Sequence, residues 1–223
     1  MFPLYDENPT RTTPYFTYGL IGMNILVFLH EVRLPNEQLE QFFQMYAVIP
    51  QELSTNFALE WTTLITSQFL HGGWWHLISN MVYLWVFGNN IEDRLGHFKY
   101  LIFYLLCGAS AALCQWFIGM SSTIPSLGAS GAIAGVLGAY IVWFPQASVM
   151  TLVFLGFFIT TIRVSAWIII GLFFIQNLIS GFASLQAAAN MSVESGGVAY
   201  WAHIGGFVFG IIFAPLFRWF SRD

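Results

Sequence analysis

Charged side chains are scarce in this sequence. Asp, Glu, Lys and Arg together make up 8% of the 223 residues, whereas 57% are hydrophobic and the mean hydropathy is +0.67. Soluble globular proteins carry about 25% charged residues. So few charges cannot cover a surface that faces water, so we predict a membrane protein whose surface is covered by lipid. The length suits a single domain over residues 1–223.

Cysteines and targeting signals are also sparse. Cys107 and Cys114 lie seven residues apart in one apolar stretch, and we interpret them as packed free thiols rather than a disulfide or a metal site. The first fourteen residues contain Asp6, Glu7 and three prolines, with no basic start and no small-residue cleavage site. This is unlike a secretory signal peptide, so we expect the membrane segments to belong to the working protein.

Apolar stretches predict an all-α fold with six membrane spans, since a span needs about 20 mainly apolar residues. Residues 149–183 are the hardest region, because they are apolar throughout except for Arg163. They could hold two spans with a charge at the hinge, or a hydrophobic surface segment followed by one span. Because 149–161 is too short to cross, we predict one span beginning near Ile162. The predicted spans are 15–30, 74–91, 100–120, 130–144, 162–183 and 199–217.

The positions of Lys and Arg predict the orientation, because basic residues favour the cytoplasmic side of short loops. With the N-terminus inside, six of the seven basic residues are cytoplasmic and only Arg33 is outside. We therefore expect both termini in the cytoplasm of a multi-pass protein, in a prokaryotic cell membrane. The first outer loop, about 31–73, is long. Its aromatic middle, 42–46, suits the membrane interface and either caps the fold or guides substrate.

Polar side chains inside a membrane are costly, so each is a functional hypothesis. With residues at span ends such as His30 and His97 set aside, we single out His71, His76, Asn80, Gln115, Ser130, Gln176, Asn177 and His203. Gln176 and Asn177 could hydrogen-bond neighbouring helices or water, and the sequence does not choose. We find no Asp or Glu in the spans at the depth of Ser130.

Ser130 is the candidate nucleophile. It lies in Gly128-Ala129-Ser130-Gly131 at the start of an apolar span, where free N–H groups and the positive end of the helix dipole suit an oxyanion. Gly128 and Gly131 would let a substrate backbone approach closely. Small residues around a serine also serve packing. We interpret Ser110 in that way, because it lies mid-helix without a following glycine.

His203 is the candidate base, since a serine hydroxyl is a poor nucleophile until a base takes its proton. Ser130 and His203 both lie at the outer ends of their predicted spans and so share a depth. Glycine faces favour close approach of these two spans. They are formed by Gly131, Gly135 and Gly138 on one span and by Gly206 and Gly210 on the other.

His76 and Asn80 lie four residues apart on one face of the second span. We predict that they donate to a developing oxyanion, and one such donor is typically worth about 3 kcal/mol. A metal site of His71, His76 and His203 is the alternative, but zinc hydrolases usually bring a carboxylate, as in His-Glu-x-x-His. We therefore expect no metal. Without an Asp to orient His203, a Ser–His dyad is predicted in place of a triad.

These motifs together resemble the rhomboid family of intramembrane serine proteases over most of the chain. The resemblance is carried by His71-x-x-x-x-His76-x-x-x-Asn80, by Gly88-x-x-x-Glu92-x-Arg94, by the Ser130 segment, and by Ala202-His203-Ile204-Gly205-Gly206 with Gly210. It implies a six-helix bundle with Ser130 at the bottom of a cavity that opens outward.

The resemblance also implies roles and partners. Ser130 would be the nucleophile, His203 the base and then the acid, and Asn80, His76 and the Ser130 N–H the oxyanion site. Substrates would be membrane proteins, cut in or beside a transmembrane segment that unwinds into the site. The implied partners are these substrates and membrane lipids, and not nucleic acid. No metal or organic cofactor is implied.

Two positions depart from the family pattern. Many rhomboids carry Trp-Arg where this chain has Thr62-Thr63, so we expect the first outer loop to be anchored differently. Many also carry an aromatic residue where this chain has Ala134, so we expect other residues to pack around His203. We interpret Glu92 and Arg94 as a structural ion pair or a loop-fixing segment. The alternative functions are a catalytically weak rhomboid-like binder of membrane proteins and a small transporter. A transporter predicts internal repeats, which we do not find.

Overall fold

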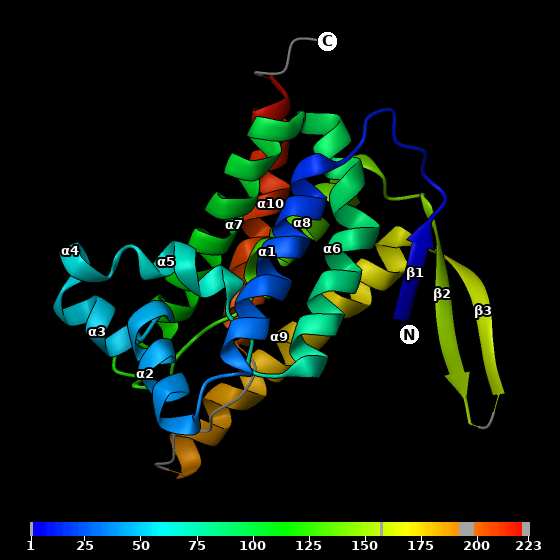
Figure 1. Cartoon of the computed structure of the whole chain (residues 1–223). Helices are drawn as coiled ribbons and strands as arrows, with labels where there is room; N and C mark the ends of the chain where they lie inside the picture. The colour runs from blue at the N-terminus through cyan, green and yellow to red at the C-terminus, as the bar shows by residue number, and fades with distance from the viewer. Residues whose placement is uncertain (1, 157, 192–198, 220–223) are drawn as a thin grey trace.

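The computed structural model describes residues 2–156, 158–191 and 199–219, and most of them are helical (Figure 1). Long helices run side by side and form the body of the molecule. Those of at least 14 described residues are α1 (Tyr15–Glu31), α6 (Trp74–Leu95), α7 (His97–Ile118), α8 (Ser130–Trp143), α9 (Ala166–Met191) and α10 (Tyr200–Trp219). Helix α8 lies at the centre, because every residue from 131 to 140 is buried.

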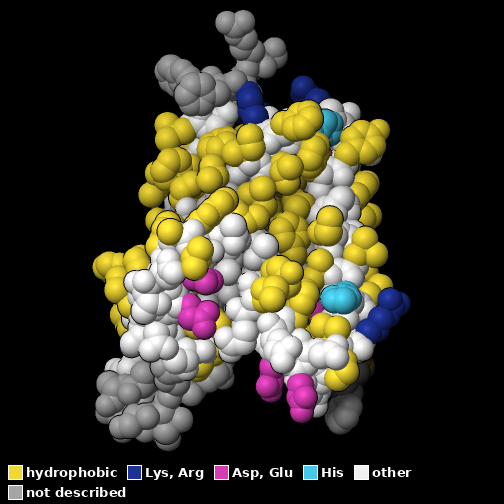
Figure 2. Space-filling model, turned by 60° about the vertical axis from the view of Figure 1, so that its left-hand side comes forward, with side chains coloured by type: hydrophobic (Ala, Val, Ile, Leu, Met, Phe, Trp, Pro, Cys, Tyr) yellow, Lys and Arg dark blue, Asp and Glu magenta, His cyan; other side chains and the backbone are white. Residues whose placement is uncertain are grey.

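Three helices are long and apolar enough to cross a membrane, judged by length and composition over the described residues: His97–Ile118, Ala166–Gln186 and Tyr200–Phe217. Helix α8 is apolar but has only 14 residues. Figure 2 shows hydrophobic side chains over the middle of one face, Lys and Arg mostly at the upper end, and Asp and Glu toward the lower end. The molecule is therefore a membrane protein, and the count of six spans stays a prediction.

A three-stranded antiparallel sheet shows that the all-α expectation was wrong. Strands β2 (Ser148–Leu155) and β3 (Phe158–Ser165) form a hairpin, and β1 (Phe2–Asp6) pairs with β2. Ile162, the predicted start of the fifth span, lies in β3 opposite Thr151, and helix α9 begins only at Ala166. Threonine, isoleucine and valine dominate 159–164, and such β-branched residues favour strands.

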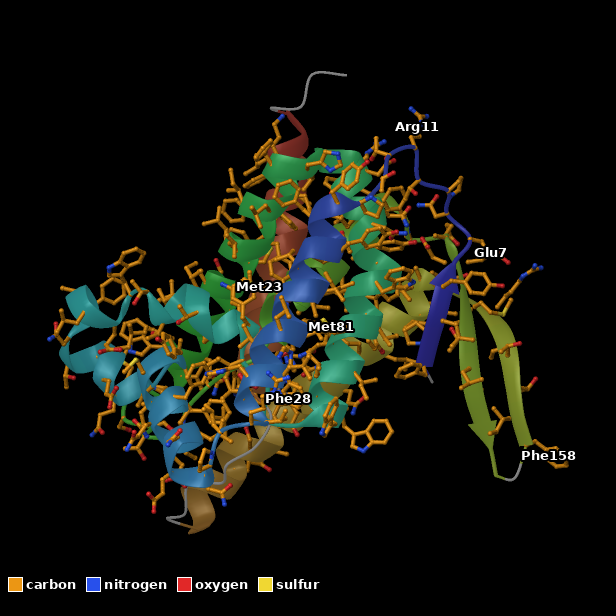
Figure 3. All side chains as sticks on the ribbon, in the orientation of Figure 1. Glu7, Arg11, Met23, Phe28, Met81 and Phe158 are labelled. Atoms are coloured by element: carbon orange, nitrogen blue, oxygen red, sulfur yellow. The ribbon has the colours of Figure 1, made fainter. Side chains whose placement is uncertain are left out.

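Polar contacts join the sheet to the helices. The Asp6 carboxylate accepts hydrogen bonds from the Tyr140 hydroxyl at 2.6 Å and from Asn90 Nδ2 at 2.7 Å. On the surface, Arg163 Nε donates to Glu7 at 2.8 Å. Figure 3 shows Glu7 at this junction and Phe158 at the far tip of the hairpin. The sheet is thus fixed to α6 and α8 at its base while its tip extends away from the bundle.

The buried Glu92 side chain joins α6 to the start of α1. Its carboxylate accepts hydrogen bonds from the N–H groups of Phe16 at 2.9 Å and Thr17 at 2.7 Å, and from the Thr17 hydroxyl at 2.7 Å. His97 Nδ1 lies 2.6 Å from the same carboxylate. A carboxylate at a helix N-terminus satisfies N–H groups that have no partner within the helix. The loop-fixing interpretation of Glu92 agrees with these contacts.

The segment between α1 and α6 folds into short helices that lie beside α7 (Figure 1). They are α2 (Asn36–Tyr46), α3 (Pro50–Thr55), α4 (Phe57–Glu60), α5 (Thr63–Thr66) and the 3-10 helix η1 (Ser67–Phe69). Val48 exchanges two backbone hydrogen bonds with Ser126, at 3.0 and 2.8 Å, and the N–H of Gly128 donates to the Ser67 carbonyl at 2.8 Å. These backbone hydrogen bonds hold the residues just before Ser130 in place.

Candidate functional site

Ser130 and His203 are brought together from separate helices. Ser130 is the first residue of α8, and His203 lies in the first turn of α10. The Ser130 hydroxyl oxygen is 2.6 Å from Nε2 of His203, which is hydrogen-bonding distance. His203 is buried and Ser130 is half-buried. The pair can therefore transfer a proton from the hydroxyl to the ring.

Glycine backbones allow this short distance. A Cβ added to Gly206 would overlap the carbonyl oxygen of Gly131, and one added to Gly210 would overlap that of Gly135. A Cβ on Gly138 would likewise overlap the carbonyl oxygen of Phe207. Helices α8 and α10 therefore pack backbone to backbone, closer than any side chain on these positions would permit.

The second ring nitrogen of His203 contacts Asn177, a residue whose role the sequence left open. Asn177 Oδ1 lies 2.6 Å from His203 Nδ1, and Asn177 Nδ2 donates to the backbone carbonyl of Phe173 at 2.8 Å. The ring of Phe173 packs against His203 at a centroid distance of 5.7 Å. Ala134 is fully buried and offers no ring. Helix α9 thus supplies both the acceptor and the aromatic contact.

His76 lies against the backbone that precedes Ser130. A Cβ added to Gly128 would lie 2.8 Å from Cε1 and Nε2 of the His76 ring and 3.7 Å from the Ser130 hydroxyl. Gly128 also has a φ of 127°, which side chains other than glycine rarely adopt. Glycine is therefore favoured here both by its backbone conformation and by the lack of room for a Cβ, and the second of these places the His76 imidazole close to Ser130.

Asn80 is buried one turn further along α6, and His71 orients its amide. Asn80 Nδ2 lies 3.1 Å from His71 Nε2. Burial, aided by the nearby His76, lowers the pKa of His71 to about 3, so the ring is neutral. Asn80 Nδ2 carries only hydrogens, so it donates to Nε2, and His71 carries its proton on Nδ1. The second Asn80 hydrogen remains for another acceptor.

A carboxylate lies near this cluster, just outside the predicted first span. Glu31 ends α1, is 1% exposed, and accepts the backbone N–H of His71 at 3.3 Å. The sequence placed Glu31 in the outer loop because it follows the last apolar residues of the first stretch. Its contact is with the backbone of His71, so it fixes the start of the segment that carries His76 and Asn80.

The candidate residues line a single cavity of about 1020 Å³. Its walls come from α6, α7, α8, α9 and α10 and from the segments that precede α6 and α8. The lining includes His76, Asn80, Gln115, Ser130, Phe173 and His203. The Ser130 hydroxyl therefore faces a space that a peptide segment could enter.

Both ring nitrogens of His203 already lie at hydrogen-bonding distance from other side chains. Nε2 contacts Ser130 and Nδ1 contacts Asn177. The metal alternative required His203 as one of three ligands, and it would have to break one of these bonds. The arrangement suits a proton-transferring imidazole better than a metal ligand.

Comparisons with known proteins agree with the motifs. A family model described as the rhomboid domain matches residues 58–220. The mitochondrial rhomboid protein 1 of Saccharomyces cerevisiae is 30% identical over 202 residues, which cover 88% of this chain and 51% of that protein. Rhomboid protease GluP of Bacillus subtilis is 36% identical over 127 residues, covering 56% of this chain and 24% of GluP.

A human relative extends this picture. The mitochondrial presenilin-associated rhomboid-like protein is 29% identical over 196 residues, covering 86% of this chain and 46% of that protein. The chain thus spans about half the length of the yeast and human relatives that it matches, and less of GluP. Two of the three relatives are named as mitochondrial, so these names do not support the expectation of a prokaryotic membrane.

Proposed function

Because this chain belongs to the rhomboid family, we propose that it is an intramembrane serine endopeptidase. It would cleave membrane proteins in or beside a transmembrane segment. The observation that carries the proposal is the 2.6 Å contact between the Ser130 hydroxyl and His203 Nε2, at the wall of a cavity of about 1020 Å³. Family membership alone does not point to particular residues, and this contact supports Ser130 and His203 as the proposed pair.

In the proposed first step, Nε2 of His203 takes the proton of Ser130 while the serine oxygen attacks the scissile carbonyl carbon. The carbonyl π electrons move to oxygen and form an oxyanion. Asn80 Nδ2, the His76 ring and the backbone N–H of Ser130 are the proposed donors to that oxyanion. Ser130 is the first residue of α8, so its N–H has no acceptor within the helix and adds to the positive end of the helix dipole.

In the second step, the imidazolium of His203 returns the proton to the leaving nitrogen, the C–N bond breaks and an acyl-enzyme remains on Ser130. Water then attacks the ester with His203 again as base, and the serine hydroxyl is restored. No cofactor takes part in this proposed sequence.

The proposed substrate is a transmembrane segment that has lost its helical hydrogen bonds locally, because a helix in lipid has no free backbone to attack. Gly128 and Gly131 were expected to let a substrate approach, but a Cβ on Gly128 would meet the His76 ring and one on Gly131 would meet Ala111 of α7, so both glycines also serve the packing around Ser130. We place this chemistry in a bundle of six spans with both termini in the cytoplasm. Apart from the surrounding lipids, the proposed partners are these substrate proteins.

The proposal is tested with purified protein in liposomes that also hold a designed single-span substrate. Wild-type protein should cleave the substrate and react with a fluorophosphonate at Ser130. Ser130→Ala and His203→Ala should lower cleavage by about 10⁴-fold or more. Ser110→Ala is the matched control, because Ser110 has a similar sequence context on α7 but belongs to no part of the site.

The alternative of a catalytically weak binder predicts a different pattern. It gives substrate capture without cleavage and no fluorophosphonate labelling of the wild-type protein. Cleavage that survives Ser130→Ala would refute the assignment of the nucleophile. Activity that disappears with a chelator would favour a metal mechanism.

A further inference from the structure

Asn177 lies mid-way along α9, in a stretch of apolar residues, and is buried with 6% of its surface exposed. An amide at such a position is costly unless its donors and acceptor are used. Both ends of the Asn177 amide are engaged: Nδ2 with the Phe173 carbonyl and Oδ1 with His203. The neighbouring Gln176, in contrast, is exposed on the surface of the same helix. Asn177 therefore makes hydrogen-bonding contacts inside the protein, whereas Gln176 lies at its surface.

The orientation of the Asn177 amide follows from chemistry. A backbone carbonyl can only accept, so the atom 2.8 Å from the Phe173 oxygen must be the NH₂ group. The carbonyl oxygen of the amide then faces His203 Nδ1 at 2.6 Å. An amide oxygen can only accept as well, so Nδ1 must carry the proton. In the neutral ring the other nitrogen, Nε2, is then the unprotonated one.

This chain of contacts determines which nitrogen faces Ser130. The Phe173 carbonyl orients the amide of Asn177, the amide oxygen selects the Nδ1–H tautomer of His203, and Nε2 presents its lone pair to the serine hydroxyl at 2.6 Å. Phe173, one turn before Asn177 on the same helix, packs against the imidazole. One turn of α9 therefore fixes the ring in both tautomer and position.

We propose that Asn177 is a positioning residue that completes a Ser130–His203–Asn177 triad, with Phe173 as the ring support in place of the residue missing at Ala134. This rests on the proposed protease function and deepens it. Asn177 touches no substrate. It acts through His203, by holding the tautomer that can accept the Ser130 proton, and by accepting the Nδ1–H when the ring becomes positively charged.

The test compares kinetic constants and pH profiles of Asn177→Leu, Asn177→Asp and Gln176→Leu in liposomes. Leucine at 177 keeps the side-chain volume but removes the hydrogen-bond acceptor. We expect kcat to fall about 10²-fold, because general-base catalysis is worth about 10²–10⁴-fold. KM should stay within about 2-fold of the wild-type value. Gln176→Leu is the matched control on the same helix turn and should retain wild-type kcat.

Aspartate at 177 restores an acceptor and adds charge. Asn177→Asp should recover part of the activity lost in Asn177→Leu, and the acid limb of its kcat profile should move to higher pH by about one unit, because a carboxylate beside the ring favours the charged imidazolium. A packing role for Asn177 would produce neither the recovery nor the displacement.

The outcomes separate this inference from the proposed function. Three results would each overturn the triad while Ser130→Ala still abolishes cleavage. They are a wild-type kcat in Asn177→Leu, a loss of kcat in Gln176→Leu as large as that in Asn177→Leu, and an Asn177→Asp variant as slow as Asn177→Leu. Failure of the wild-type protein to cleave or to react with a fluorophosphonate would instead overturn the proposed function itself.

Discussion

Replacing Gly206 by alanine should separate Ser130 from His203. The added Cβ would overlap the carbonyl oxygen of Gly131 and lie 3.0 Å from its carbonyl carbon. Carbon atoms in contact normally lie about 3.5–4.0 Å apart, so α8 and α10 must move apart by about 1 Å. Backbone atoms of both helices form this contact, so no side-chain rotation can relieve it.

The effect on catalysis follows from where the contact lies. Gly131 follows Ser130 directly and Gly206 is three residues after His203, so a separation here acts on the pair itself. The Ser130–His203 distance would rise from 2.6 Å to about 3.6 Å, beyond hydrogen-bonding range. A displacement of about 1 Å at a catalytic pair can cost about 10²-fold in rate. Overpacking should also lower the free energy of unfolding by about 1–3 kcal/mol.

Cleavage and fluorophosphonate labelling, both normalised to the folded fraction, give the measurement. Gly171→Ala on α9 and Gly22→Ala on α1 are the controls, because a Cβ at either position meets no atom within 4 Å. Both controls should keep wild-type kcat. If Gly206→Ala also kept it, the close backbone packing of α8 and α10 would not be what sets the distance between Ser130 and His203.

Two further predictions concern α6 and the sheet. Asn80→Ala should lower kcat by about 10²–10³-fold with little change in KM, since one oxyanion donor is lost and others remain; an unchanged kcat would remove Asn80 from the site. Burial raises the pKa of Asp6 above its ordinary value of 3.8, so the folded protein holds this proton more tightly than the unfolded chain does. The resulting stability is present below pH of about 4 and is lost as pH rises through the raised pKa. The melting temperature of wild type minus that of Asp6→Asn should therefore fall as the pH rises above about 4, and a constant difference would contradict the prediction.

The meeting of Ser130 and His203 could be predicted because its signals are local. The helix-breaking residues before Ser130 indicate a helix start, and glycines three or four residues apart indicate a face on which helices approach closely. Their depth followed from the charge distribution along the chain. None of these steps required knowledge of which helices are neighbours.

The sheet could not be predicted in the same way. A mainly apolar run such as 149–162 fits a strand as well as part of a helix, because it has no regular alternation of polar and apolar residues that would distinguish them. Gly156, with a φ of 63° in the turn, was the available signal for a hairpin. The pairing of β1 with β2 joins residues about 150 positions apart and has no local signal at all.

The partner of His203 was undecided for a related reason. The sequence shows that Gln176 and Asn177 are both polar and mid-span, but which of them faces α10 depends on the rotation of α9. The predicted span began near Ile162, four residues before the helix does. Only the packing of α9 against α10 places Asn177 on the inner face.

An asparagine as the proposed third member of the triad suits a site buried among membrane helices. An ionised carboxylate there would cost several kcal/mol to bury, whereas a neutral amide does not. In Ser-His-Asp proteases the change of Asp to Asn lowers kcat by about 10⁴-fold, because the amide favours the wrong tautomer of the histidine. That loss requires an amide free to point its NH₂ group at the ring. Here the NH₂ group is held 2.8 Å from the Phe173 carbonyl, so only the oxygen can face Nδ1. The low polarity of the surroundings thus accounts for the residue type at position 177, and the hydrogen bond within α9 accounts for its orientation.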